Sequence, residues 1–424
     1  MVKKLLFAAL LGLVASGLGV PAAARVDIDA ARSWNERALN AVRANRSTDA
    51  DAARLYAMVN VAMYDAVNGI TRTRAPALVP DRGPRKADEQ AAAAAAAHAV
   101  LVRLDATRAA DYDAALAADL ARLGNGQGVT TGVAWGRSVG DRVVTARADD
   151  GSTPVESQPA GAGPGVFRAA WSGTQYRHVR PFAVADPSRY VPGPPPTLDS
   201  VLYAGAFAEV AVLGDAALTA PDLLATFQFW SLPAGSDQPP GEWLRIALAV
   251  AGDRRLPLAD EVRLTALLTM ALSDTSVTTV ATKYTYQHWR PTTAIREADT
   301  DNNPVTTADP TWTARAGAVG GTPEYVSGHS SYSGAGAAAL QGFFCTDAIG
   351  FALATDSAPG GVARTYAGFS KAAAEAGRSR VFGGQHFEFS NQAGLEIGRG
   401  VATEVLSTSL LRATGPTHFG ACPR

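Results

Sequence analysis

The chain has 424 residues, of which 47% are hydrophobic and 18% are charged, and its formal net charge is −1. This composition is that of a globular protein and excludes an intrinsically disordered chain. A net charge so close to zero also gives no general attraction to a polyanion such as nucleic acid. Any anion site must therefore be a local cluster of Lys and Arg.

The first 24 residues have the pattern of a secretory signal peptide. Two lysines at positions 3 and 4 precede an apolar run over residues 5–20, and small residues at 21–24 offer a cleavage site before Arg25. The alternative is an uncleaved membrane anchor, but the run is short for a helix that crosses a bilayer. No later run is apolar enough either, so we expect a secreted or periplasmic protein whose mature form has no membrane span.

The sequence contains two cysteines, Cys345 and Cys422. In an exported protein they have one possible pairing, which would tie the C-terminal tail to the body of the protein. The alternative is two unpaired thiols. We expect the disulfide.

Apolar residues recur at helical spacing along most of the chain. In the segment Asp51–Asn68, for example, Leu55, Met58 and Ala62 fall on one helical face. The Ala-rich segment Ala91–Leu104 contains no helix breaker and predicts a closely packed structural helix. No period-two strand series and no repeat of fixed length is present, so we predict an all-α fold. The other predicted helices are Trp34–Asn45, Leu198–Leu213, Pro221–Trp230, Trp243–Gly252, Asp260–Leu272, Ser330–Phe344, Val362–Ala376 and Asn391–Ser407.

Residues 149–200 interrupt the helical pattern with many Gly and Pro residues. Trp171, Tyr176, Phe182 and Tyr190 lie among them, and an unstructured linker rarely carries so many aromatic residues. We therefore predict a long, ordered Gly/Pro-rich loop that packs over the core.

We expect three parts along the chain. Residues 1–24 form the signal peptide, and residues 25–200 contain N-terminal helices and the aromatic loop. Residues 201–424 form a helical bundle that carries the chemistry and makes one compact unit with the preceding part.

The first candidate for an anion site is the pair Lys283 and Arg290, in the segment KYTYQHWRP. Seven residues are about two helical turns, so on one continuous helix both would lie on the same face, roughly 10 Å apart along the axis. Pro291 predicts a break or bend in the helix at this point. Taken alone, such a pair is usually a solvated helix face. The aromatic residues between them indicate burial, however, and buried cations need a counter-charge that an anionic ligand can supply.

The second candidate is Ser327-Gly328-His329, where a loop turns into a helix. Free N–H groups at a helix start bind oxyanions without any side-chain charge. His329 is placed to transfer protons at the bound group. Taken alone, the tripeptide would be an ordinary helix cap.

The third candidate is Arg380 with His386, which follows the glycine pair Gly383-Gly384. Arg380 offers a planar fork for two oxygens. The glycines allow a close backbone approach, so that His386 could act as a nucleophile or a metal ligand. A core histidine bonded to a carbonyl is the alternative.

In order and spacing, these three segments resemble the signature of type 2 phosphatidic acid phosphatases (PAP2) and vanadium haloperoxidases: K-x6-RP, then SGH, then SR-x5-H. The helices within residues 34–68 and the stretches 177–182 and 286–296 also resemble the large, soluble bacterial haloperoxidase-type branch. The resemblance covers most of the mature chain and implies a helical bundle of this type.

The resemblance also implies a role for each motif residue. His386 would bond to vanadium or phosphorus, His329 would act as general acid/base, and Lys283 would polarise bound peroxide. Three cations and a helix start match the charge of a transferring phosphoryl group, and vanadate adopts the same five-coordinate geometry. The residues that would hold the oxygens of vanadate or phosphate are Lys283, Arg290, Ser327, Gly328 and Arg380.

The sequence departs from the family pattern at two positions. The family usually has Asp four residues after the last histidine, where this chain has Ser390. Ser390, Glu388 or Asn391 would have to orient His386 in its place. The position seven before the SGH histidine is aromatic or His in the haloperoxidases, whereas here it is Thr322, so a halide preference cannot be transferred.

The remaining histidines and one acid have simpler interpretations. We expect His98, His288 and His418 to be structural, and His178 to be the only other candidate for the rim of the pocket. Asp274 either pairs with an arginine of the site or is a surface acid.

Three functions are compatible with these residues. The leading one is a vanadate-dependent peroxidase that oxidises halide with hydrogen peroxide. The second is an exported acid phosphatase that hydrolyses a small phosphomonoester through a phospho-His386 intermediate. The third is a non-catalytic oxyanion-binding helical protein, against which the presence of all seven motif residues argues.

Overall fold

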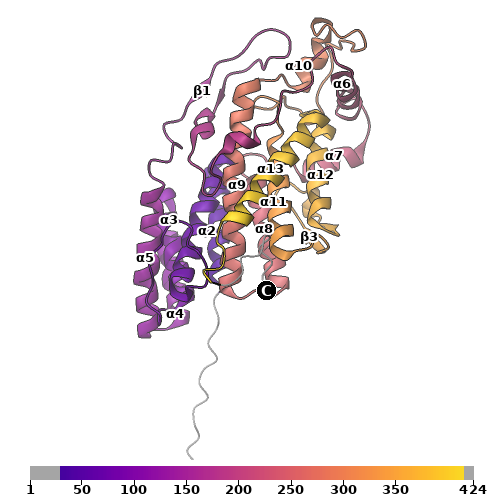
Figure 1. The fold of residues 1–424 in the computed structure, drawn as a ribbon. Helices are drawn as coiled ribbons and strands as arrows, with labels where there is room; N and C mark the ends of the chain where they lie inside the picture. The colour runs from indigo at the N-terminus through magenta and orange to yellow at the C-terminus, as the bar shows by residue number, and fades with distance from the viewer. Residues whose placement is uncertain (1–28, 415–424) are drawn as a thin grey trace, which may run out of the picture.

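The computed structural model describes residues 29–414. The signal-peptide segment, His418 and Cys422 lie outside the described residues. Helices dominate this part of the chain (Figure 1), which confirms the all-α class. The α-helices are α1 (Ala30–Asn45), α2 (Asp49–Thr71), α3 (Glu89–Leu104), α4 (Ala109–Leu123), α5 (Gln127–Ala146), α6 (Val201–Leu213), α7 (Pro221–Phe229), α8 (Gln238–Asp253), α9 (Leu258–Tyr286), α10 (Pro291–Arg296), α11 (Gly328–Phe344), α12 (Phe369–Phe382) and α13 (Glu388–Thr408).

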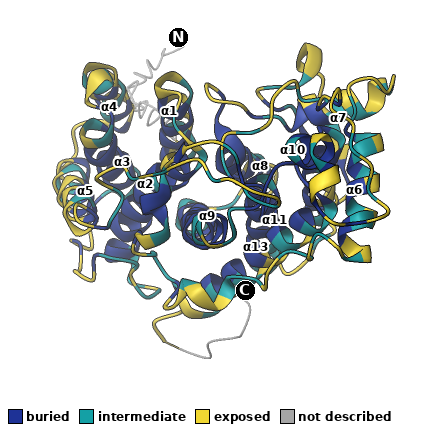
Figure 2. Cartoon of the chain, turned by 90° about the horizontal axis from the view of Figure 1, so that it is seen from above, coloured by how far each residue is buried: buried dark blue, intermediate teal, exposed yellow. Residues whose placement is uncertain are grey.

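Helix α9 runs through the middle of the molecule. Figure 2 shows it end-on, dark blue, with α1–α5 on one side and α6, α7 and α10 on the other. Helices α2, α11 and α13 pack directly against it. One continuous hydrophobic cluster runs from Ala30 in α1 to Leu410 after α13. The N-terminal helices and the C-terminal bundle therefore share a core.

By length and composition, α9 could cross a membrane, since it has 29 residues and a window of mean hydropathy 1.2. The expectation that no run after the signal segment is apolar enough is therefore wrong for this helix. However, 89% of the window is buried inside the protein. Such burial is typical of the core helix of a globular fold.

The Ala-rich helix α3 has the structural role that its sequence predicts. Its first seven alanines, residues 91–97, are completely buried. Helix α5 packs against it so closely that a Cβ added to Gly136 would lie 2.1 Å from the carbonyl oxygen of Ala92. Helix α5 carries a glycine at every fourth position from 128 to 140. In the sequence these glycines argue against a helix, and in the fold they allow this contact.

The loop of residues 149–200 is ordered and packs on the core, as predicted. It contains a two-stranded ribbon (β1, Ser157–Gln158, and β2, Trp171–Ser172) and short 3-10 turns. Asp274 of α9 anchors it by accepting the backbone N–H groups of Phe182 at 2.6 Å, Ala183 at 2.8 Å and Val184 at 3.0 Å. Both interpretations of Asp274 were therefore wrong, because it is buried and binds no arginine of the site.

One further element differs from the sequence prediction. The helix expected over Val362–Ala376 begins only at Phe369, because residues 364–366 form β4 (Arg364–Tyr366), antiparallel to β3 (Phe351–Leu353). At the end of α11, Cys345 has a left-handed backbone conformation with φ 57° and is disulfide-bonded.

Candidate oxyanion site

Lys283 and Arg290 do not share one helix face. Helix α9 ends at Tyr286, because Gln287 adopts a left-handed conformation with φ 47°, and Arg290 is the N-cap residue of α10. The two side chains nevertheless meet, since both donate to the segment that leads into the second motif. Lys283 Nζ donates to the carbonyl of Pro323, and Arg290 Nε donates to the carbonyl of Thr322 at 2.8 Å.

The side chain of Glu324 lies at the centre of the site and has no solvent exposure. It accepts hydrogen bonds from His386 Nδ1 at 3.0 Å, His288 Nδ1 at 3.2 Å and the N–H of Phe387 at 3.0 Å. Burial alone would raise the pKa of Glu324, but the hydrogen bonds from His288 and His386 hold this pKa well below its ordinary value. Glu324 is therefore a carboxylate, and it orients the ring of His386.

Glu324 takes the place of the family Asp, so Glu388 and Asn391, two of the proposed substitutes, do not orient His386. The carboxylate of Glu388 accepts Arg378 Nη1 at 2.6 Å, and Asn391 Oδ1 accepts Ser330 Oγ at 2.9 Å. The third substitute, Ser390, lies closer. Its Oγ donates to the carbonyl of Glu324 at 3.2 Å and is 3.5 Å from His386 Nδ1, which makes it a secondary contact.

The hydrogen bonds of His386 determine its tautomer. Arg290 Nη1 lies 2.9 Å from His386 Nε2, and a guanidinium can only donate. Nε2 therefore accepts, and the proton is on Nδ1, where it is donated to Glu324. Burial and the like charge of Arg290 lower the pKa of His386 well below its ordinary value, against the opposing effect of Glu324. The ring is neutral with its Nε2 lone pair facing the cations, as a nucleophile or metal ligand requires.

His329 is the second residue of α11 and is also neutral. Its Nε2 lies 3.1 Å from the carbonyl of Ser231, so Nε2 donates and Nδ1 remains able to accept a proton. Burial and the like charge of Arg380 lower the pKa of His329 well below its ordinary value. This arrangement suits a general base.

The start of α11 offers fewer free N–H groups than expected. Ser327 caps the helix, with its Oγ 3.3 Å from the N–H of Ser330. Its own N–H donates to the carbonyl of Ser390 at 3.3 Å, so it is not available to a ligand. The N–H of Gly328 has no acceptor among residues 29–414. Gly328 thus offers the backbone donor of this cap, and Ser327 holds the cap in place.

Arg380 is buried and incompletely bonded. Its Nη2 donates to Gln385 Oε1, but its Nε has no hydrogen-bond partner in the described chain. Burial and the like charge of Arg290 lower the pKa of Arg380 to about 9, so it remains a cation at neutral pH. Nε can therefore donate to a ligand.

The charges of the site fit an oxyanion. Arg290 and Arg380 are buried cations, with pKa values lowered to about 10 and about 9, and Glu324 is the internal carboxylate that faces Arg290. Lys283 is buried as well, and burial and the like charge of Arg290 lower its pKa well below the ordinary value, although Glu324 and Asp49 oppose the shift. An oxyanion bound here would supply the counter-charge that favours protonated Lys283 and would neutralise the surplus positive charge of the site. No three His, Cys, Asp or Glu side chains cluster as metal ligands in the described part of the chain. A metal that enters as an oxyanion, held mainly through its oxygens, suits these residues.

Asp49, the first residue of α2, brings a second carboxylate to this pocket. Its Oδ2 would lie 3.5 Å from a Cβ added to Gly328, so it faces the free N–H end of α11. Burial raises the pKa of Asp49, although Lys283 opposes the shift. No motif marks Asp49, which is more than 230 residues before Lys283. Only the fold brings them together.

The site opens into a pocket of about 470 Å³. His178 is exposed and does not line this pocket, so its interpretation as a rim residue was wrong. The structural interpretation of His98 agrees with its 2.7 Å contact with Asp113. His288 belongs to the site through Glu324. The residues around the pocket include Arg46, Asp49, Phe227, Ser231, Leu232, Gln238, His329, Arg380 and Gln385.

Residues 263–412, which contain all seven motif residues, match the family model "VCPO second helical-bundle domain". This match covers about a third of the chain and shows that this part is similar to the second helical-bundle domain of that family. No curated protein matches its sequence.

Solved structures of bacterial vanadium-dependent haloperoxidases are similar to this chain in fold. A bacterial vanadium-dependent iodoperoxidase is 22% identical with a TM-score of 0.78, and the match covers 91% of this chain and 97% of the iodoperoxidase. The apo form of a bacterial vanadium-dependent chloroperoxidase is 16% identical with a TM-score of 0.64, covering 83% and 92% of the two chains. The holo form is 17% identical with a TM-score of 0.64 and covers 83% and 90%.

Proposed function

We propose that this protein is a vanadate-dependent haloperoxidase that oxidises halide with hydrogen peroxide. The observation that carries the proposal is the state of His386. It is neutral, its Nδ1 proton is held by Glu324, and its Nε2 accepts a hydrogen bond from the buried cation Arg290 at 2.9 Å. This arrangement supplies one nitrogen ligand and a cationic shell for the oxygens of a tetrahedral oxyanion.

Each residue of the oxyanion site would have a separate role in binding vanadate. Arg290, Arg380 and Lys283 would hold oxygens of vanadate, and the free N–H of Gly328 would donate to another. Arg290 Nη1 would exchange its hydrogen bond to His386 Nε2 for a bond to an oxyanion oxygen. When bound, vanadate supplies a Lewis-acid centre that activates peroxide. Lys283, whose Nζ donates to the Pro323 carbonyl, would donate a hydrogen bond at the site, and a bound oxyanion would supply the counter-charge that favours its protonated form.

His329 would move the protons of the reaction. Halide oxidation consumes one proton, since X⁻ + H₂O₂ + H⁺ gives HOX + H₂O. The free Nδ1 of neutral His329 would accept a proton from entering peroxide and return it to the leaving oxygen. Nε2, bonded to the carbonyl of Ser231 at 3.1 Å, would keep the ring in place through both steps.

A second candidate function is the hydrolysis of a phosphomonoester. The same cage would hold a phosphoryl group, and His386 Nε2 would attack phosphorus. The surplus positive charge of the site would stabilise a bound phosphoryl group as well as it would stabilise vanadate. If neither reaction depends on His386, a non-catalytic oxyanion-binding role remains.

One experiment separates these functions. Iodide, bromide and chloride oxidation with peroxide are assayed after vanadate loading, and phosphomonoester hydrolysis is assayed without vanadate. We expect vanadate to switch on halide oxidation and to inhibit any phosphatase activity. Hydrolysis without vanadate-dependent oxidation of any halide would overturn the haloperoxidase proposal. The three halides are compared because the position that is aromatic or His in the haloperoxidases is Thr322 here, whose carbonyl accepts Arg290 Nε at 2.8 Å.

We also propose that the protein is exported to the periplasm or the medium and that signal cleavage leaves a mature chain beginning at Arg25. The support is the sequence pattern of residues 1–24 and the disulfide at Cys345. N-terminal sequencing of protein recovered from the extracytoplasmic fraction tests this. A chain that retains Met1 in the cytoplasm would contradict it.

A further inference from the structure

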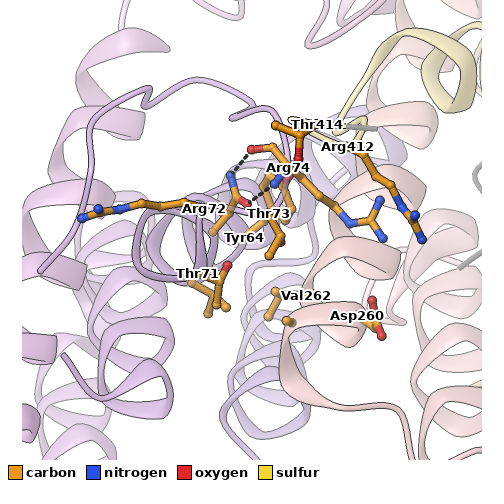
Figure 3. A pocket seen from close by; sticks show the side chains of 12 residues that line it. Tyr64, Thr71, Arg72, Thr73, Arg74, Asp260, Val262, Arg412 and Thr414 are labelled. Carbon is orange, nitrogen blue, oxygen red and sulfur yellow. Dashed lines mark hydrogen bonds between the residues drawn. The ribbon is translucent and has the colours of Figure 1, made fainter. Parts of the chain in front are cut away.

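Figure 3 shows a second arginine-rich pocket, of about 500 Å³. It lies at the opposite end of α9 from the oxyanion site, because Asp260 in the first turn of α9 lines it. Asp260 at this end and Lys283 at the other are 23 residues apart on one helix, which corresponds to about 35 Å. The two pockets are therefore independent. The pocket is lined by Tyr64, Val67, Asn68, Thr71, Arg72, Thr73, Arg74, Ala259, Asp260, Val262, Arg412 and Thr414.

The backbone places Arg74 and Arg412 side by side. They form an isolated antiparallel bridge, flanked by a hydrogen bond from Ala413 N–H to the carbonyl of Thr73 at 3.1 Å. Asn68 fixes this segment by bonding the N–H of Arg74 at 3.0 Å and its carbonyl at 2.8 Å. Figure 3 shows both guanidinium groups pointing to the same side of the pocket. The pair is thus held by backbone contacts from two distant parts of the chain.

Neither guanidinium has a partner. No ion pair or side-chain hydrogen bond of Arg74 or Arg412 is present among residues 29–414. Asp260 lines the same pocket, but no bond joins it to either arginine (Figure 3). Arg74 is partly exposed and Arg412 is exposed, so only their backbone is held in place. Two adjacent cations without a counter-ion repel each other, and an anion between them would relieve this repulsion.

A third arginine adds to the positive charge. Arg263, in the second turn of α9, is only 1% exposed, and its Nη1 has no hydrogen-bond partner. Burial and the like charge of Arg74 lower the pKa of Arg263 to about 10, with a smaller effect from Arg412. A buried guanidinium without a carboxylate partner is costly. Arg263 does not line the pocket but lies close enough for Arg74 and Arg412 to act on it, and Asp260 is the one carboxylate in the lining. The region therefore has a surplus positive charge.

We propose that this pocket is a second anion site, which binds a small oxyanion such as inorganic phosphate between Arg74 and Arg412. Two planar forks side by side match an anion with several oxygens, as in bidentate arginine–phosphate contacts. The start of the 29-residue helix α9 lies at the same pocket and adds a favourable dipole. The bound anion would fasten the segment after α2 to the segment after α13 and stabilise the fold.

Phosphate titration of the full-length protein tests the proposal. Isothermal calorimetry is expected to find two phosphate sites in the wild type, one in each pocket. In the Arg74→Ala/Arg412→Ala variant we expect one site to weaken by about 100-fold or more, because two charge-assisted contacts are lost. The matched control is Arg82→Ala/Arg85→Ala, which removes two exposed arginines that do not line this pocket. The control should keep both sites.

A second measurement distinguishes the loss of the anion site from misfolding of the variant. Phosphate should raise the melting temperature of the control variant more than that of Arg74→Ala/Arg412→Ala, while both variants keep the wild-type circular dichroism spectrum. Phenylphosphonate is titrated in parallel, since its binding at this site would identify the phosphoryl group of a larger molecule as the ligand, and its exclusion would identify the free ion. Equal phosphate stoichiometry in the two variants overturns the proposal.

Discussion

The carboxylate of Glu324 and Nδ1 of His386 lie 3.0 Å apart, and this contact determines which nitrogen of the histidine can reach a bound oxyanion. Glu324 comes from the segment before α11, whereas His386 comes from the turn before α13. The orienting carboxylate is therefore supplied across the site. In the family pattern it comes from the residues that follow the histidine.

Glu324→Gln removes the charge that holds the Nδ1 proton while keeping the size of the side chain. We expect vanadate affinity to fall by about 10–100-fold, the usual cost of losing a partner that orients a metal ligand. Equilibrium dialysis with vanadate measures the affinity. An unchanged affinity would show that Glu324 does not orient His386.

Ser390 provides the matched rescue for this variant, because its Oγ is 3.5 Å from His386 Nδ1. The double variant Glu324→Gln/Ser390→Asp returns a carboxylate at the position where the family has one, and should recover part of the lost affinity. Ser390→Asp alone places a second buried carboxylate beside Glu324, and we expect it to lower the melting temperature. A rescue that fails despite a wild-type fold would mean that the direction of the carboxylate matters more than its charge.

The two histidines are expected to separate by role. His386→Ala removes the nitrogen that faces the cations and should abolish vanadate retention. His329→Ala should retain vanadate, because Arg290, Arg380 and Gly328 remain, and should lower the rate by about 10²–10⁴-fold, the range for a positioned acid or base. Dialysis measures retention and the halide assay measures the rate. Equal retention by both variants would contradict the assignment.

Most helices and the grouping of the three motifs could be predicted from the sequence, because amphipathic spacing and motif order are local properties. The actual positions of Lys283 and Arg290 could not be predicted, and the prediction that they share one helix face was wrong. Gln287 ends α9 in a left-handed backbone conformation that a glutamine does not usually indicate. Glu324 was missed although it lies five residues before His329. The family pattern places the orienting acid after the last histidine, whereas Glu324 lies before the Ser327-Gly328-His329 motif.

Asp49 should make oxyanion binding depend on pH. As a carboxylate it repels an oxyanion at the Gly328 end of the site, whereas in its protonated form it can donate a hydrogen bond. Because burial raises its pKa above the ordinary value, wild-type affinity should fall as the pH rises through this pKa. The other charged groups that act on Asp49 are Lys283, which lowers its pKa, and Asp51, which raises it.

Asp49→Asn should flatten this pH dependence. It should also strengthen vanadate binding at neutral pH by roughly tenfold, which corresponds to about 1.4 kcal/mol of binding free energy. Vanadate affinity is measured from pH 5 to pH 8 for both proteins. Asp141→Asn, an exposed position on α5 away from the pocket, makes the same charge change and should behave as wild type. A parallel change in both variants would assign the effect to net charge.

Asp274→Ala should loosen the loop over residues 149–200 without touching the oxyanion site. The carboxylate accepts three backbone N–H groups of that loop, at 2.6–3.0 Å, and its removal leaves buried donors without partners. We expect the free energy of unfolding to fall by about 3 kcal/mol, as measured by urea denaturation. Limited proteolysis should cut within residues 149–200 faster than in wild type or in Asp141→Ala. Slower halide turnover with unchanged vanadate affinity would place the loop in the path of substrates, whereas uniform cleavage along the chain would contradict its role as a local anchor.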